Sequence, residues 1–309
     1  MKRLLVLFVA AALSASAADK KIIFVAGKPS HGPGEHEHRA GCLLLKKCLD
    51  QTPGFISEVY SNGWPTDNKV FEGADAIVIY SDGGGGHPAV QDDHLKVLGE
   101  LMKKGVGLGC IHYGVEVPKD KGGPEFLDWI GGYFETFRSV NPHWDGNFKE
   151  FPAHPVANGV KPFTTRDEWY YHMRFREEMK GVTPILTAVP PDSTRGKPGM
   201  NDAHGGNPEV QAHKGEPEHT MWVSERPNGG RGFGVTGAHF HKNWGEENFR
   251  RAVLNSIVWI AKAEVPPNGI QSKITPEDLL ANQDPKGPRK PRVEAPKIEP
   301  FVSPTLPGK

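Results

Sequence analysis

The stretch ADAIVIYSDGGGGHPAVQDDHLKVLGELMKKGVGLGCIH, residues 74–112, decides the fold class. It contains two continuous apolar runs, Ala74 to Ser81 and Gly105 to His112, of the kind that lie buried in parallel sheets. Between them, Pro88 to Lys103 has the periodicity of an amphipathic crossover helix. The Gly83–Gly86 run lacks the Lys-Ser/Thr ending of a P-loop, so it predicts a close turn rather than a nucleotide site. This order predicts an α/β protein with a doubly wound sheet and a ligand site at the carboxyl ends of its strands.

The same alternation of strand and helix continues on both sides of this stretch. We expect further strands at Lys21–Gly27, Phe55–Tyr60 and Arg231–Gly237, and a closing amphipathic helix at Glu247–Lys262. The segment Gly131–Asn228 is rich in loops and aromatic residues and has weaker periodicity. It predicts long insertions over the edge of the sheet rather than a second domain.

The two ends of the chain differ in composition from its middle. A positive start, an apolar run over 4–13 too short to span a bilayer, and an A-x-A site at Ala15–Ala17 indicate a signal peptide. Residues beyond 265 are rich in Pro, Lys and Glu, which is typical of a disordered tail or a strap across the surface. We therefore expect a signal peptide over 1–18, one α/β domain over 19–265, a tail over 266–309, and export to the periplasm or the medium.

Charge and cysteine content exclude several classes of protein. The chain has 37 basic and 37 acidic residues, and removal of Lys2 and Arg3 with the signal peptide leaves 35 against 37. No basic stripe precedes the tail, so neither nucleic acid nor an anionic membrane surface is expected as a partner, and no later segment is long enough to span a membrane. Cys42 and Cys48 lie too far apart on one predicted helix to form a disulfide, and Cys110 falls in a predicted strand. All three are expected to be small buried hydrophobic residues.

Several of the 14 histidines fall where strand ends should converge. Imidazole is a common ligand of Zn²⁺, which takes three or four N or O donors. Each histidine alone is better explained as a loop cap or a core hydrogen-bonding group, whereas the set predicts a pocket. The set comprises His31, His36 and His38 after the first strand, His87 and His112 after the next two, His239 and His241 after the last, and His143 and His172 from the insertions.

The order of several motifs resembles that of the ThuA-like family, named for trehalose utilisation. The motifs are SHGPGEHEH, GCIHYG, GGYFETF, HPVANGVKPFTTRDEWYYH and TGAHFHKNW, and the resemblance runs from about Lys21 to Lys262. It implies a flavodoxin-like, mostly parallel sheet similar to that of class I glutamine amidotransferases. Those enzymes carry a nucleophilic Cys in a strand-to-helix elbow, where this chain has His112-Tyr113-Gly114. Because Cys110 lies two residues earlier, inside the predicted strand, glutaminase activity is not expected.

The resemblance also implies a class of chemistry. ThuA-like proteins are linked to pathways that cleave 3-keto-glycosides, whose ketone acidifies the hydrogen on C2 so that a base can remove it and the C1 substituent can leave. A divalent metal, with Zn²⁺ suspected, would polarise the ketone. We therefore expect a metal-assisted lyase or hydrolase that acts on an oxidised glycoside or a related small carbohydrate. The alternatives are a non-catalytic carbohydrate-binding module of the same fold and a structural domain whose tail binds a partner.

Each candidate residue receives a role on this hypothesis. Glu168 is the expected base or a metal-linked carboxylate, and Asp167 is the weaker choice, a turn cap. Glu35 and Glu37 are equally well explained by the start of the following helix. The expected catalytic residues are Glu168, His112 and His172; the expected metal ligands are His31, His112, His172 and His239, with His36, His38, His143 and His241 in second place; and the expected substrate-binding residues are Trp144, Trp169, Tyr170, Tyr171 and Arg174.

Overall fold

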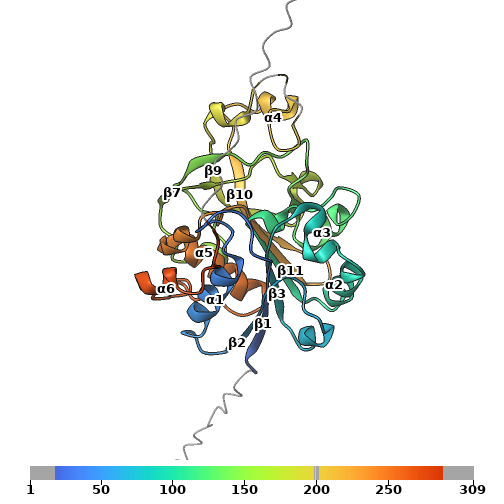
Figure 1. The fold of residues 1–309 in the computed structure, drawn as a ribbon, viewed down its shortest axis with the longest axis vertical. Coiled ribbons are helices and arrows are strands. Elements are labelled where there is room, and N and C mark those ends of the chain that lie inside the picture. Colours follow the sequence, from blue (N-terminus) through green and yellow to red (C-terminus); the bar gives the residue numbers. More distant parts are fainter. Residues whose placement is uncertain (1–17, 198, 200–201, 288–309) are drawn as a thin grey trace, which may run out of the picture.

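A seven-stranded sheet forms the centre of the computed structural model, which describes residues 18–197, 199 and 202–287 (Figure 1). The strand order is β2-β1-β3-β4-β11-β10-β9; the first five strands are parallel, and β10 pairs antiparallel with both β11 and β9. The strands are β1 (Lys20–Ala26), β2 (Phe55–Tyr60), β3 (Ala76–Tyr80), β4 (Gly107–Ile111), β9 (Val182–Ala188), β10 (Glu218–Glu225) and β11 (Arg231–Val235). The predicted α/β class with a mostly parallel sheet is confirmed.

Both faces of the sheet are covered, because its central strands are apolar on both sides. In β1, Ile22 and Phe24 belong to the core on one face, while Ile23 and Val25 belong to the core on the other. Helices α1 and α5 cover the first face, and α2 and α3 cover the second (Figure 1). The helices are α1 (His38–Leu49), α2 (His94–Lys103), α3 (Gly123–Trp129), α4 (Pro208–Ala212), α5 (Glu247–Ile260) and α6 (Pro276–Leu280).

The middle of the chain contributes more regular structure than its composition predicts. Strands β9 and β10 extend the main sheet, so the segment 131–228 is partly a continuation of the sheet and partly the expected insertions. The register of β10 shifts on both sides of Met221, and this irregularity interrupts the alternation that would identify a strand in the sequence. The insertions form two small sheets, in which β5 (Gly132–Tyr133) pairs with β8 (Arg174–Phe175) and β6 (His143–Phe148) with β7 (Phe163–Glu168).

The expected signal peptide lies outside the described residues except for its last position. The described part of the tail, 266–287, runs over the surface, and its helix α6 begins with a capping box formed by Thr275 and Asp278. Asp278 also pairs with Lys47 of α1. Among the described helices, none is long and apolar enough to cross a membrane. The three cysteines are buried with free thiols, as predicted.

Candidate metal centre

A group of polar side chains lies at the carboxyl ends of the parallel strands, where the doubly wound topology predicts a site. His36 is in the loop after β1, Asp82 follows β3, His112 follows β4 directly, and His239 follows β11. Glu168 is the last residue of β7, a strand of the insertions. Residues far apart in the sequence are therefore brought together by the ends of four strands and one insertion.

Three imidazoles and one carboxylate converge in this group. The Nε2 atom of His36 lies 3.0 Å from Nδ1 of His239 and 3.1 Å from Nε2 of His112. The Oε2 atom of Glu168 lies 3.1 Å from the same nitrogen of His239 and 3.5 Å from that of His112. All three histidines are buried. Tetrahedral coordination with bonds of about 2.0–2.1 Å separates donor atoms by about 3.3 Å, close to the observed spacing.

The hydrogen bonds of the outer ring nitrogens determine where the lone pairs point. Nδ1 of His112 lies 2.7 Å from the carbonyl oxygen of Thr236, which can only accept, so this nitrogen carries the hydrogen. Nδ1 of His36 lies 2.7 Å from the Asp82 carboxylate and donates in the same way. In the neutral rings both Nε2 atoms then present lone pairs to each other, which is repulsive unless a proton or a cation lies between them. This donor set, with its outer partners, fits a divalent cation such as Zn²⁺.

The charge states in the cluster also suit cation binding. Burial, and then the neighbouring imidazoles, lower the pKa of His36 far below its ordinary value. Burial alone would raise the pKa of Glu168, but hydrogen bonds and charge from His112 and His239 outweigh it, so the pKa is well below normal. Burial alone would lower the pKa of His239, but the hydrogen bond and the charge of Glu168 outweigh burial and raise the pKa of His239. At neutral pH the His36 ring is therefore uncharged and can offer a nitrogen lone pair to a cation, beside the ionised carboxylate of Glu168.

Two of the imidazoles are carried by residues with a strained backbone, which the surrounding structure must impose. His36 has φ 47° and His112 has φ 55°, a left-handed conformation that costs of order 1–3 kcal/mol for a residue other than glycine. His112 makes the turn from β4 into the short 3₁₀ helix His112–Val115. The facing turn must approach closely, because a Cβ on Gly83 would lie 2.2 Å from the carbonyl oxygen of Tyr113. The elbow expected at this position is present, and it carries an imidazole.

Asp167 holds the loop that carries His239. It is fully buried, and its carboxylate accepts hydrogen bonds from the amides of Ala238 at 2.7 Å, Phe240 at 3.3 Å and Glu168 at 2.9 Å. Since these amides flank both a ring and the carboxylate of the cluster, Asp167 fixes their separation. This is the turn-capping role that the sequence predicts for it.

Two further histidines lie beside Asp82 rather than inside the cluster. The half-exposed ring of His31 stacks on His36 with centroids 3.5 Å apart, and its Nδ1 lies 3.9 Å from the Asp82 carboxylate. Nδ1 of His38 lies 3.0 Å from the carbonyl oxygen of Lys28, and its Nε2 lies 3.6 Å from Asp82. Burial lowers the pKa of His38 to about 4, so this ring is neutral. His36, given second place from the sequence, is thus central, and His31 is peripheral.

His172 is not brought to the cluster. Its Nδ1 lies 3.4 Å from Glu218 and its Nε2 lies 3.5 Å from Glu209, with the ring of His213 against it at 4.9 Å between centroids. Glu218 begins β10 of the main sheet and Glu209 lies in α4, and the backbone of His172 accepts from Oγ of Ser139 at 2.9 Å and donates to Glu218 at 3.0 Å. The catalytic and ligand roles expected for His172 therefore have no geometric support in the described residues.

Of the remaining candidates, two lie near the cluster. The Tyr170 hydroxyl is 3.3 Å from Nε2 of His112 and 3.4 Å from Glu168, and the exposed ring of His143 lies 5.1 Å from that of His239. The other side chains are engaged elsewhere. Trp144, Trp169 and Tyr171 are buried in the core, His241 is buried beneath the tail, and Arg174 makes a two-point ion pair with Glu135 at 2.8 and 3.0 Å.

The sequence reasoning missed Asp82 and two residues near the cluster. Asp82 follows a predicted strand directly, as His112 does, and that position was the available signal. The Asn141 amide donates to Oε1 of Glu168 at 3.3 Å, and the half-buried ring of Tyr113 lies 6.0 Å from that of His36. Neither residue has a pattern that distinguishes it from an ordinary loop residue.

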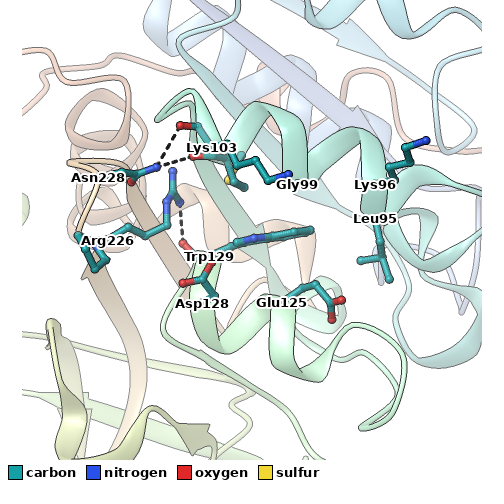
Figure 2. A pocket seen from close by; sticks show the side chains of 11 residues that line it. Leu95, Lys96, Gly99, Lys103, Glu125, Asp128, Trp129, Arg226 and Asn228 are labelled. Carbon is teal, nitrogen blue, oxygen red and sulfur yellow. Dashed lines mark hydrogen bonds between the residues drawn. The ribbon is translucent and has the colours of Figure 1, made fainter.

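A separate hollow of about 590 Å³ lies at the opposite end of β4, between α2 and α3 (Figure 2). Two of its polar side chains donate hydrogen bonds to the surrounding backbone. Arg226 donates to the carbonyl oxygen of Trp129, and Asn228 donates to those of Met102 and Lys103 at the end of α2 (Figure 2). None of the cluster residues lines this hollow, and we assign it a structural role.

The fold and the cluster together define a flavodoxin-like α/β protein with a candidate metal centre at the carboxyl ends of its strands. The family model described as "Trehalose utilisation" (ThuA) matches residues 23–260, and the chain belongs to this family. A putative ThuA-like protein from Bacteroides uniformis ATCC 8492 has a similar structure, with TM-score 0.54, 15% identity, and coverage of 81% of this chain and 94% of that one. One from Parabacteroides merdae ATCC 43184 has TM-score 0.53, 15% identity, and coverage of 84% and 99%. At this identity the two structures support the fold alone, and no curated protein matches the sequence.

Proposed function

We propose that this protein is a metal-assisted lyase or hydrolase that cleaves a 3-keto-glycoside, or a related oxidised small carbohydrate, in sugar catabolism. Membership of the ThuA family supports the link to carbohydrate metabolism. The observation that carries the proposal is the convergence of three imidazole nitrogens and one carboxylate oxygen, all within 4.8 Å of one another.

His36, His112 and His239 would hold the cation, with Glu168 beside it. A bound divalent cation would supply Lewis-acid polarisation of the C3 ketone and so acidify the hydrogen on C2. On the proposal, Glu168 accepts that proton, the C2–H electron pair forms the C1–C2 double bond, and the C1–O bond breaks. The departing oxygen then takes the proton back from Glu168. If Glu168 is instead a fourth ligand of the cation, a water molecule would accept the proton.

Tyr170 is placed to assist at the same atoms. Burial, and then the charge of Glu168, raise the pKa of Tyr170 well above its ordinary value, so the hydroxyl keeps its proton. A protonated hydroxyl 3.4 Å from Glu168 can donate to a developing oxyanion beside it. His143, Asn141 and Tyr113 lie near the cluster and would offer polar atoms to the hydroxyl groups of a sugar.

The signal-like N-terminus supports a further part of the proposal, that the reaction takes place outside the cytoplasm. We expect the protein to be recovered from the periplasmic or culture fraction, with its N-terminus near residue 19. Recovery of the full-length chain from the cytoplasm alone would contradict it.

Metal content and turnover together test the proposed activity. Elemental analysis after exhaustive dialysis should find about one divalent metal ion per chain, as expected for one group of ligands formed by His36, His112, His239 and Glu168. Glu168→Gln should abolish turnover of a 3-keto-glycoside while the thermal unfolding midpoint stays high, and the exposed Glu72→Gln is the matched control. Loss of turnover with metal retained assigns Glu168 as the base, whereas loss of both assigns it as a ligand. A metal-free wild-type protein that binds sugar without cleaving it would refute the proposal and favour the carbohydrate-binding module.

A further inference from the structure

The described end of the C-terminal tail reaches the loop that carries His36. The side chain of Lys286 is only 6% exposed and that of Glu37 is fully buried, with Nζ 3.1 Å from Oε1. Lys286 also donates to the carbonyl oxygen of Glu35 and to that of His36, the latter at 3.3 Å. A tail residue 250 positions away along the chain thus holds the backbone of a candidate metal ligand.

Burial of this ion pair is costly, so it needs the further bonds that surround it. The Glu37 carboxylate accepts from the amide of Gly34 at 2.9 Å and from the amide of Asp284 at 2.8 Å. One carboxylate thereby joins the His36 loop to the tail. These bonds do more than add general stability, because each of them ends either on the loop that carries His36 or on the tail segment that covers this loop.

The backbone of His36 is held from both sides. Its amide donates to the carbonyl oxygen of His239 at 3.0 Å, and the amide of His241 donates to Gly34 at 2.9 Å. Its carbonyl group is held by Lys286. Since His36 has φ 47°, a conformation that relaxes unless its surroundings impose it, these contacts maintain the angle at which the ring enters the cluster.

We infer that Lys286 is a positioning residue for the cation site, and that docking of the segment 282–287 is coupled to cation binding. This inference rests on the proposed cation site. Coupling between two sites is reciprocal, so a docked tail that raises cation affinity is itself held more firmly when the cation is bound. The tail segment 282–287 then contributes to the cation affinity of the site.

The test compares Zn²⁺ affinities of the full-length chain by competition with a chromophoric chelator. Lys286→Met should weaken Zn²⁺ binding by about 5-fold or more, the lower end of the usual range for coupling between two sites. Lys47→Met is the matched control, because it removes the other ion pair that ties the tail to the body, at α1, and should leave the affinity unchanged. Lys286→Arg, which keeps the charge and the donors, should restore most of the affinity.

A second measurement separates positioning from general stability. In the metal-free protein, amide exchange at His36 and His241 should be faster in Lys286→Met than in Lys47→Met, while urea unfolding is similar in the two. Zn²⁺ should slow proteolysis within 276–287 in the wild type and much less in Lys286→Met. Equal Zn²⁺ affinity of wild type and Lys286→Met would overturn the inference and leave the proposed function intact. A wild-type protein that takes up no Zn²⁺ would overturn both.

Discussion

Replacing Asp82 by Asn is expected to weaken cation binding without unfolding the protein. The Asp82 carboxylate accepts from Nδ1 of His36 at 2.7 Å, and this bond orients the ring and increases the electron density on the opposite nitrogen. Asn offers a neutral oxygen of nearly the same shape. The substitution therefore removes the charge from the contact and leaves its geometry in place.

The size of the effect follows from the exposure of the two partners. A hydrogen bond to a charged group contributes about 1.5–3 kcal/mol, and the buried His36 ring supports the upper part of that range. The Asp82 side chain, however, is 36% exposed, so solvent screens part of its charge. A loss of about 1–2 kcal/mol remains, which corresponds to a rise of about 5- to 30-fold in the dissociation constant.

The assay is a competition titration with Zn²⁺ at pH 7.5, accompanied by a thermal melt of the metal-free protein. Ser30→Ala is the matched control, because Ser30 donates to the same carboxylate at 2.9 Å without contacting the His36 ring. Unchanged affinity in Asp82→Asn would refute the view that Asp82 tunes His36. A loss above a thousandfold would refute it in the other direction, since Asp82 would then be a ligand itself.

Three further predictions concern stability, each measured by urea unfolding. Burial lowers the pKa of His87 to about 4, so the unfolded chain takes up its proton at a higher pH than the folded chain; stability should fall by roughly 2–3 kcal/mol as the pH drops from about 6.5 to 4, and His87→Gln should lack this slope. The hydrogen bond from Arg174 lowers the pKa of Glu135 to about 2, so its contribution is present above about pH 4.5 and is lost towards pH 2; Glu135→Gln should cost about 1.5–3 kcal/mol at pH 7, and no cost there would contradict the ion pair. Gly109→Ala should destabilise by at least about 1–3 kcal/mol, because the new Cβ would lie 2.1 Å from a ring carbon of Phe233, and a neutral result would mean that the core relaxes freely.

The parallel half of the sheet could be predicted from the sequence because burial on both faces leaves an unbroken apolar signal. The runs that became β1, β3 and β4 are of this kind, and the strand ends then located the cluster. Strand β10 could not be found in the same way. Its register shifts near Met221 break the two-residue alternation, and it lies between β11 and β9, the second of which pairs with it from about thirty to forty positions away.

The candidate site was predictable as a location and less so as a list of residues. His112 and His239 followed from their positions at strand ends, and Glu168 followed from the family resemblance. The order of His31 and His36 could not be predicted, because nothing in the sequence of their common loop indicates that the His36 side chain is 1% exposed and that of His31 40%. Trp144 and Trp169 are expected from the sequence to bind substrate, yet both are in the core, since composition does not tell which face of an irregular segment is buried.

The wide separation of the cluster residues along the chain has a consequence for biosynthesis. The rings of His36 and His239 are in contact, yet the two residues are 203 positions apart. A fragment from the first half of the polypeptide therefore lacks some of the proposed ligands. Metal uptake is therefore expected only after nearly the whole polypeptide has been made and folded. In a pulse-labelling experiment, the fraction of chains that carry the ion should report completed folding rather than synthesis.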